Sequence, residues 1–350
     1  MNKKSLKKKV SVALVAFLVS SSLFSMKSSE SKVEASRVVN ICIDPGHGGT
    51  GGRNLGAQYN GLSEKEITLK VANAMKEELS KYEGVNIYMT RTTDTEISLK
   101  NRAAYAASVN ADFVYSIHFN ASTGHDLCGS EVWTSGFGSF YQKGYSFGEI
   151  EENELLNLGI YPRGVKTKLG TNGDYYGIIN NSRLFNIPCV IIEHCYLDQG
   201  ADLNWLKSSK DPYTILGKAD ATAVAKYFGL SSSLLKVNYG NYPKNNVVPP
   251  KFPKGEDLTN PTVCKINSAV RNKSAKTITA NISVKDPDTM IIYYKYSLDG
   301  GITWSSVVGW NRALETDTVV IPNPNNSKIL TIRAYNQYDL TADSLPVIMK

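Results

Sequence analysis

Cysteine is scarce in this sequence, with five cysteines among 350 residues. They form no Cys-x-x-Cys pair and follow no regular spacing, so the pattern is not that of a disulfide framework. Cys42, Cys189 and Cys195 stand in apolar, strand-like sequence, where a cysteine most often acts as a small buried hydrophobic residue. The sequence does not decide whether two of these three cysteines form a disulfide.

Long apolar runs are also missing, since a membrane-spanning helix needs roughly 20 apolar residues. The run Val10–Val19 is about half that length and follows a basic segment that ends at Lys9. Ser-rich sequence then leads to small residues at Val33 and Ala35, which suit a signal-peptidase cut after Ala35. We therefore expect residues 1–35 to be a cleaved signal peptide rather than a membrane anchor, and no membrane span in the remainder.

The chain lacks a strong charge of one sign once its N-terminus is set aside. The net charge is +7, but residues 1–35 contribute +5 through seven Lys and two Glu, which leaves +2. A nearly neutral mature chain gives no support to a nucleic-acid partner.

A glycine-rich turn around a histidine is the first feature that points to a site. Val38–Ile43 is a short run of strand-forming residues that stops at Pro45, and His47 follows among glycines. Glycines next to a histidine let backbone and ligand approach closely, as a metal or a bound substrate requires. By itself the turn fits an ordinary surface loop equally well.

A helix is predicted to follow this turn. Ser63 and Glu66 have the spacing of a capping box, and apolar residues recur with helical period at Ile67, Val71, Ala74, Met75 and Leu79. Glu64 then lies in the first turn, where the helix dipole favours a carboxylate. Helix capping is therefore the alternative to a functional role for Glu64.

Two further strands frame a second helix and end in a second histidine. Residues 85–90 alternate like a strand, residues 97–109 have helical period, and Phe113–Ile117 is an apolar strand that runs into His118. This alternation predicts an α/β domain, a twisted mixed sheet flanked by crossover helices, whose site lies at the C-terminal ends of the strands. His47 and His118 are both expected there.

The next hundred residues continue the pattern and add a carboxylate. We predict a strand at 129–134, an irregular helix at 138–159 interrupted by Gly144 and Gly148, a loop at 163–166, and a closing helix at 212–228. The most apolar strand, Ile187–Ile192, runs directly into Glu193. A carboxylate at the end of a buried strand is costly unless a partner or a reaction uses it.

Two imidazoles and a carboxylate suit a catalytic zinc ion with three protein ligands and a water. A further carboxylate could take a proton from that water and pass it to a leaving amine. No His-Glu-x-x-His helix and no Gly-x-Ser-x-Gly elbow occur in the sequence. Cys195 and His194 are adjacent, so their side chains diverge on a strand and make a poor nucleophile–base pair.

Five motifs in this order resemble the zinc-dependent N-acetylmuramoyl-L-alanine amidases of the type 3 group, over roughly residues 38–228. The stretches that carry the resemblance are Asp44–Gly49, Gly61–Lys65, Thr90–Asp94, Ser116–Ala121 and Ile191–Glu193. The resemblance implies one zinc ion held by His47, Glu64 and His118, with Glu193 as the catalytic carboxylate.

The reaction that the resemblance implies is hydrolysis of the amide between N-acetylmuramic acid and L-alanine in peptidoglycan. Such an autolysin-like enzyme is expected to be secreted and to act outside the cell or on its wall. The chain departs from the family pattern after Glu193, where an aliphatic residue and Gly are usual and His194 and Cys195 stand instead. We expect His194 to face the opposite side of the strand, Arg91 to anchor loop carboxylates rather than substrate, and His125 to be solvated.

The second half predicts a different architecture, consistent with a length that exceeds one small core. We expect a catalytic domain at 36–230, an extended Ser-, Asn-, Lys- and Pro-rich linker at 231–260, and an immunoglobulin-like β-sandwich at 261–350. Ser297–Trp304 resembles the Asp-box, a structural hairpin turn. The aromatic residues of this module could bind glycan, but packing within a sheet is the favoured interpretation.

Three function classes therefore stay open. The first is the secreted zinc amidase, with a C-terminal module that attaches it to the wall or spaces it from a partner. The second is a wall-binding protein whose amidase-like domain has lost catalysis, and the third is another zinc hydrolase of amides. The presence of all four chemical positions favours the first class.

Overall fold

The computed structural model describes residues 37–350. The predicted signal peptide at 1–35 lies outside the described residues. Within 37–350, no helix combines the length and the apolar character that crossing a membrane requires.

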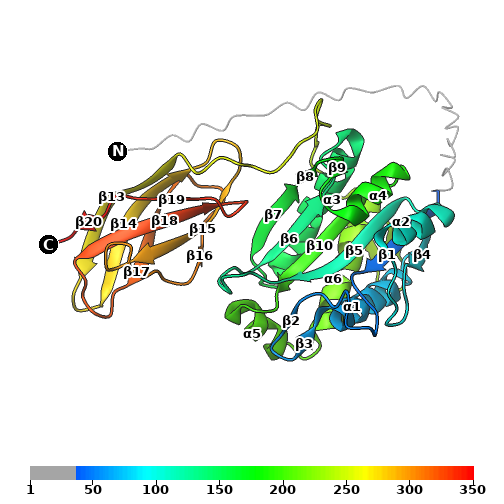
Figure 1. The fold of residues 1–350 in the computed structure, drawn as a ribbon, viewed down its shortest axis with the longest axis horizontal. Coiled ribbons are helices and arrows are strands. Elements are labelled where there is room, and N and C mark those ends of the chain that lie inside the picture. Colours follow the sequence, from blue (N-terminus) through cyan, green and yellow to red (C-terminus); the bar gives the residue numbers. More distant parts are fainter. Residues whose placement is uncertain (1–36) are drawn as a thin grey trace, which may run out of the picture. The chain divides into compact units, whose positions relative to one another are not determined.

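A six-stranded mixed sheet forms the centre of the N-terminal region (Figure 1). In spatial order its strands are β4 (Val85–Met89), β1 (Val39–Pro45), β5 (Phe113–Asn120), β10 (Cys189–Tyr196), β6 (Ser130–Thr134) and β7 (Pro162–Thr167). Neighbouring strands run parallel, except that β10 and β6 are antiparallel. The prediction of an α/β domain with a mixed sheet is confirmed.

Helices cover both faces of this sheet. They are α1 (Glu64–Leu79), α2 (Leu99–Ser108), α3 (Gly138–Asn157), α4 (Gly177–Leu184), α5 (Gly200–Ser208) and α6 (Pro212–Phe228). Along β1, Ile41 and Ile43 pack into the core under α1, α3 and α6, whereas Cys42 packs into the core beside α2 and α4. Because successive strand residues point to opposite faces, the part of β1 that is buried on both sides is the apolar run Ile41–Ile43, and Asn40 and Asp44 flank it.

Short two-stranded ribbons complete the region. They are β2 (Gln58–Tyr59) with β3 (Leu62–Ser63), β8 (Leu169–Gly170) with β9 (Gly173–Asp174), and β11 (Ser231–Ser232) with β12 (Val237–Asn238). The first ribbon lies between the histidine loop and α1 in the chain, and its second strand ends directly before Glu64.

Three local predictions are wrong. The segment 163–166 is part of β7, because Arg163 and Lys166 pair with a buried carboxylate instead of facing solvent. Helix α3 is continuous, and Gly144 permits close packing on β6: an ideal Cβ there would lie 2.8 Å from Cβ of Thr134. The capping box at Ser63 does not form, since its hydroxyl accepts a hydrogen bond from the Gln58 amide instead of capping α1.

The C-terminal region is all β, consistent with the predicted sandwich. One sheet contains β13 (Val263–Asn272), β14 (Thr277–Lys285) and β17 (Thr316–Pro322). The other contains β16 (Val308–Gly309), β15 (Ile291–Ser297), β18 (Ile329–Asn336) and β19 (Thr341–Asp343), with β20 (Val347–Ile348) beside β18. Tyr294 and Trp310 are buried in the core between the sheets, which supports packing over glycan binding for these two aromatics.

The Asp-box segment forms a self-contained turn. Asp299 accepts hydrogen bonds from the backbone amides of Ile302 and Thr303, which closes the turn after β15. Its role in this fold is structural, as the sequence predicted.

The segment between these regions has little regular structure but is held in place. Residues 243–261 contain no helix or strand. The amide of Lys254 donates to the carbonyl of Gly136, and the carbonyl of Gly255 accepts a hydrogen bond from the hydroxyl of Thr167. These bonds tie the segment to the strands and loops beside β7.

Candidate metal centre

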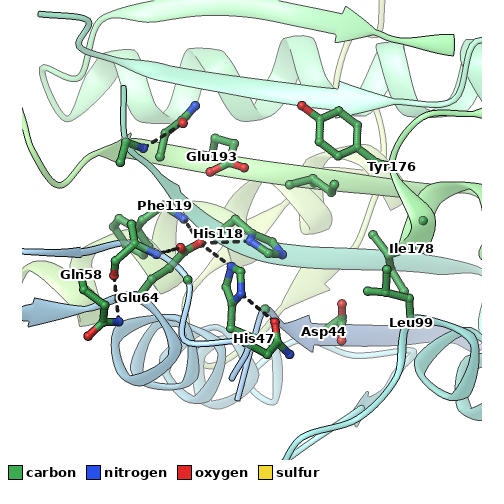
Figure 2. Close-up of a pocket in the computed structure, with 18 of the residues that line it drawn as sticks. Asp44, His47, Gln58, Glu64, Leu99, His118, Phe119, Tyr176, Ile178 and Glu193 are labelled. Atoms are coloured by element: carbon green, nitrogen blue, oxygen red, sulfur yellow. Dashed lines mark hydrogen bonds and ion pairs between the residues drawn. The ribbon is translucent and has the colours of Figure 1, made fainter. Parts of the chain in front are cut away.

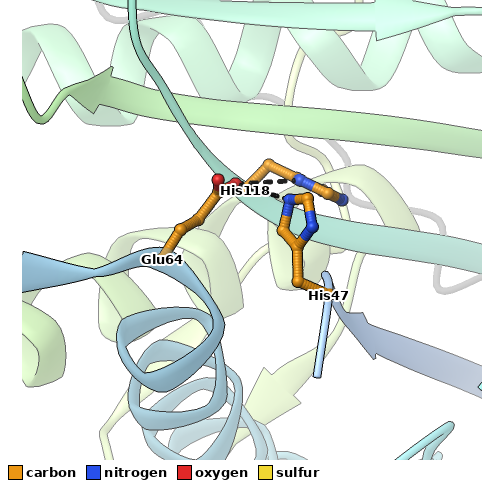
Figure 3. A group of neighbouring side chains, drawn as sticks. All are labelled: His47, Glu64 and His118. Carbon is orange, nitrogen blue, oxygen red and sulfur yellow. Dashed lines mark hydrogen bonds and ion pairs between the residues drawn. The ribbon is translucent and has the colours of Figure 1, made fainter. Parts of the chain in front are cut away.

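Three side chains from three separate elements meet at the C-terminal edge of the sheet (Figure 3). His47 follows β1, Glu64 begins α1, and His118 lies on β5. Oε1 of Glu64 is 3.1 Å from Nε2 of His47 and 3.1 Å from Nδ1 of His118. The adjacent ends of parallel strands β1 and β5 bring the two imidazoles together, with ring centroids 4.8 Å apart.

Glu64 is a buried acceptor rather than a solvated helix cap. Its side chain is only 4% exposed, Oε1 accepts from the amide of Phe119 at 3.0 Å, and Oε2 accepts from the amide of Ala57 at 2.6 Å. Burial opposes ionisation, but hydrogen bonds from His118 and His47 hold the pKa of Glu64 below its ordinary value. The carboxylate is thus fixed in position and charged.

The backbone of His47 has an unusual conformation, with φ at 60° in the left-handed region. A non-glycine residue there costs on the order of 1 kcal/mol or more and persists only when its surroundings enforce it. Here Nη2 of Arg102 donates to the carbonyl of His47 at 2.6 Å, and Oδ1 of Asn54 lies 3.0 Å from Nδ1 of its ring. The second contact leaves Nε2 as the nitrogen that faces Glu64 and His118.

A buried ion pair beneath the loop supports this conformation. Oδ1 of Asp44, at the end of β1, lies 2.8 Å from Nη1 of Arg102, and both side chains are 2% exposed. Burial opposes ionisation of Asp44, but the Arg102 charge and hydrogen bonds from Thr90 and Ser116 lower its pKa. Arg102 therefore links the strand end to the carbonyl of His47.

Arg91 anchors the same loop, but through carbonyl groups and not through the loop carboxylates that the sequence led us to expect. It donates to the carbonyls of Pro45 at 2.9 Å, Gly46 at 2.8 Å and Lys65 at 2.7 Å. These bonds join the histidine loop to the first turn of α1, which carries Glu64.

The donor set fits a zinc ion. Nitrogen and carboxylate oxygen donors of His47, Glu64 and His118 all lie within 4.8 Å of one another, and three such ligands with an open position are typical of catalytic zinc. The Nδ1 of His47 is bonded to an amide oxygen, the kind of outer contact that orients metal-binding histidines.

Glu193 faces the same space from the neighbouring strand (Figure 2). It pairs in register with His118 on one side and with Glu131 on the other. Its Oε2 atom is buried and has no hydrogen-bond partner among the described residues. Burial, with the charges of Glu64 and Glu131, raises the pKa of the carboxyl well above its ordinary value.

These four side chains line one cavity of about 800 Å³. Its polar part includes Asn54 and Gln58, and its apolar part includes Leu99, Tyr176 and Ile178 (Figure 2). The cavity therefore offers hydrogen-bonding groups near the two histidines and a hydrophobic wall on α2 and α4.

Sequence reasoning missed Glu131, which lies directly beside Glu193. It accepts from Nε of Arg163 at 2.8 Å, Nζ of Lys166 at 2.6 Å and Nδ2 of Asn120 at 2.9 Å. Burial opposes ionisation, but Lys166 and Arg163 lower its pKa to about 2. Residues 163–166 do not alternate in sequence, so no local signal revealed the strand or the buried carboxylate that its cations neutralise.

The other singled-out residues lie apart from the cavity lining. His194 is completely buried on the face of β10 opposite Glu193, as expected, and Cys195 is also buried. His125 is 53% exposed and its Nδ1 lies 2.7 Å from Oδ2 of Asp198. All five cysteines lie within 37–350, and none pairs with another there.

Comparisons with known proteins agree with the sequence motifs. A family model described as N-acetylmuramoyl-L-alanine amidase matches residues 41–226. The chain is 31% identical over 203 residues to N-acetylmuramoyl-L-alanine amidase CwlM of Bacillus licheniformis, covering 56% of this chain and 71% of that protein. It is 31% identical over 221 residues to the sporulation-specific N-acetylmuramoyl-L-alanine amidase of Bacillus subtilis (strain 168), covering 59% and 76%.

A solved N-acetylmuramoyl-L-alanine amidase from Clostridium difficile 630 is 25% identical, with a TM-score of 0.47, and covers 55% of this chain and 97% of that structure. The family match spans more than half of the sequence and includes all four residues of the site. This chain belongs to the N-acetylmuramoyl-L-alanine amidase family.

Proposed function

We propose that this chain is a secreted, zinc-dependent hydrolase that cleaves the amide between N-acetylmuramic acid and L-alanine in peptidoglycan. The observation that carries the proposal is the convergence of four groups in one cavity. His47, Glu64 and His118 present metal donors, and Glu193, whose Oε2 has no hydrogen-bond partner within residues 37–350, faces the same space.

The three donors would hold the zinc ion. When bound there, zinc would polarise a substrate carbonyl and lower the pKa of a water molecule. Glu64 contributes negative charge that stays fixed, because the amides of Phe119 and Ala57 hold its two oxygens.

Glu193 is the proton-carrying group in this proposal. Oε2 takes a proton from the attacking water and returns it to the nitrogen of the leaving L-alanine. A carboxyl whose pKa is raised by burial holds that proton long enough to serve as the acid. Glu131 is unsuited to this role, since Arg163 and Lys166 keep it ionised.

The cavity walls suit a glycopeptide. Asn54, Gln58 and Asn120 offer polar groups on the side of the histidines, whereas Leu99 and Tyr176 form an apolar wall. A substrate with a polar sugar and small alkyl groups at the cleaved bond has matching chemistry on both sides.

The domain division remains part of the proposal. We assign residues 1–35 to a signal peptide, 36–230 to the catalytic domain, 231–260 to a connecting segment, and 261–350 to a β-sandwich module. The module would attach the enzyme to the wall or space it from a partner, and the enzyme would act outside the cell.

The decisive experiment uses purified peptidoglycan. The full chain is incubated with it in the presence of zinc, after chelation, and after zinc is restored, and free L-alanine N-termini are measured. The expected result is release with zinc, none after chelation, and recovery on restoration.

Other outcomes would favour the competing classes. No release from zinc-loaded protein that still binds peptidoglycan would leave a wall-binding protein. Hydrolysis of simple N-acyl amides without release of L-alanine termini would indicate another zinc hydrolase.

A further inference from the structure

A second buried polar cluster lies behind the candidate metal centre. It consists of Glu151 on α3, His194 on β10 and Asp220 on α6, and all three side chains are completely buried. Their donor atoms lie within 4.8 Å of one another. None of the three lines the cavity, so the proposed reaction does not use them directly.

His194 contacts the segment that carries the metal ligands. Its Nδ1 lies 3.1 Å from the carbonyl oxygen of His118, and a carbonyl can only accept, so Nδ1 carries the proton. Its ring stacks on Phe119 with centroids 5.1 Å apart and 23° between planes. One imidazole therefore touches both residues of the pair His118–Phe119.

Each residue of that pair serves the metal centre. The His118 ring faces Glu64, and the amide of Phe119 donates to Oε1 of Glu64 at 3.0 Å. A rotation of the His118–Phe119 peptide would thus move one ligand and release the hydrogen bond that holds another. His194 opposes such a rotation from the other face of the sheet.

Two helices in turn fix His194. Oδ1 of Asp220 lies 2.9 Å from Nε2 of His194. Glu151 lies beside Asp220, and neither of its carboxyl oxygens has a hydrogen-bond partner among the described residues. Burial and the Asp220 charge raise the pKa of Glu151 well above its ordinary value, so Glu151 is the uncharged member. The imidazole is held at both nitrogens and cannot turn without breaking a buried hydrogen bond.

We propose that His194 is a positioning residue that orients the zinc-ligand pair His118–Phe119, and that Asp220 with Glu151 fixes His194 in that role. This inference rests on the proposed function, since it takes His118 to be a zinc ligand. Polar groups behind metal ligands typically change metal affinity by 10- to 100-fold when removed.

The test measures zinc affinity in the full chain by competition with a chromophoric chelator. His194→Leu and Asp220→Asn are compared with Val224→Ala, a buried substitution one helical turn from Asp220 that removes packing but none of the polar groups of this cluster. We expect the zinc Kd to rise about 10- to 100-fold for His194→Leu and about tenfold for Asp220→Asn. It should stay within about twofold for Val224→Ala. The absorption spectrum of the cobalt-loaded protein should change in the first two variants alone.

Four results would overturn the proposal. An unchanged zinc Kd and cobalt spectrum in His194→Leu would do so, as would an equal loss of affinity in Val224→Ala. A second equivalent of metal in the wild type that Glu151→Gln abolishes would make the cluster a metal site instead. If His194→Leu does not fold, the isosteric Asp220→Asn variant decides, and an unchanged Kd there refutes the inference. Failure of the proposed function is distinct, because it appears in the wild type, as no zinc binding or as zinc binding without release of L-alanine termini, whereas this inference is judged by the zinc Kd of the variants relative to the wild type.

Discussion

Gly46 and His118 are in direct contact across the ends of β1 and β5. An ideal Cβ on Gly46 would lie 2.8 Å from Nδ1 of His118, and closer still to Nε2 and Cε1. The glycine thus leaves just enough room for the imidazole to face Glu64. Because the carbonyl of Gly46 also accepts from Arg91, the loop cannot easily move away.

Gly46→Ala is therefore expected to displace the His118 ring and weaken zinc binding by at least about tenfold. Gly51→Ala is the matched control, since a Cβ there meets no atom within 4 Å. Chelator competition on both purified variants gives the comparison. Equal zinc affinity in the two would show that His118 does not need its observed position.

Glu64→Gln should lose zinc affinity, whereas Glu66→Gln should retain it. The two residues lie in the same helical turn, but Glu64 is buried against both imidazoles and Glu66 is exposed. The measurement is metal content after dialysis against a weak chelator. Loss in Glu66→Gln, or none in Glu64→Gln, would contradict the assigned ligand set.

Glu193→Gln should keep zinc but lose hydrolysis of peptidoglycan by roughly 10²- to 10⁴-fold, the usual contribution of a general acid–base group. Gln occupies the same space next to His118 but cannot take up and return a proton. Zinc content and release of L-alanine termini are measured on one preparation. Turnover close to that of the wild type would exclude Glu193 as the proton carrier.

The buried Asp44–Arg102 ion pair should stabilise the folded state as well as support the loop that carries His47. Arg102→Met leaves the Asp44 carboxylate buried without its ion-pair partner, which typically costs about 3–5 kcal/mol of the free energy of unfolding. The control is Lys285→Met, which removes an exposed pair with Glu315 and should cost at most about 1 kcal/mol. Urea unfolding of both variants tests this, and equal costs would refute it.

Glu152 should make stability fall as the pH rises. Burial raises its pKa from 4.5 to about 7, so between these pH values the folded protein binds a proton that the unfolded chain has released. By linkage, stability is lost over this window as the pH rises, by up to about 3 kcal/mol.

Glu152→Gln should then be more stable than the wild type at pH 8, and the difference should disappear near pH 4.5. The Gln side chain can still accept the hydrogen bond that Glu152 receives from the amide of Gly164. Thermal midpoints at both pH values provide the test. A pH-independent difference would show that the carboxyl does not titrate in this window.

Much of the fold follows from local pattern. The strand 113–117 and the helix 212–228 were predicted within a few residues, because apolar alternation or helical period reports directly which face is buried. The same logic placed His47 and His118 at one edge of the sheet, since parallel strands end on the same side.

Other features depended on partners distant in sequence. Arg163 and Lys166 looked like a polar loop, yet they lie on a strand because Glu131 is buried beside them. Ser63 has the spacing of a helix cap, but its hydroxyl accepts a hydrogen bond from the side-chain amide of Gln58 instead. Short-range propensity cannot anticipate such competition for one donor or acceptor.

The sequence by itself determined the mixed α/β sheet, the two histidines at its edge and the carboxylate of Glu193 on the most apolar strand. Only the tertiary structure decided that Glu64 turns inward between the imidazoles and that His194 meets Asp220 behind them. The reason is physical: periodicity fixes which face of an element is buried. Pairing of buried polar groups depends on which distant residues share the same water-free space, where each donor and acceptor must find a partner.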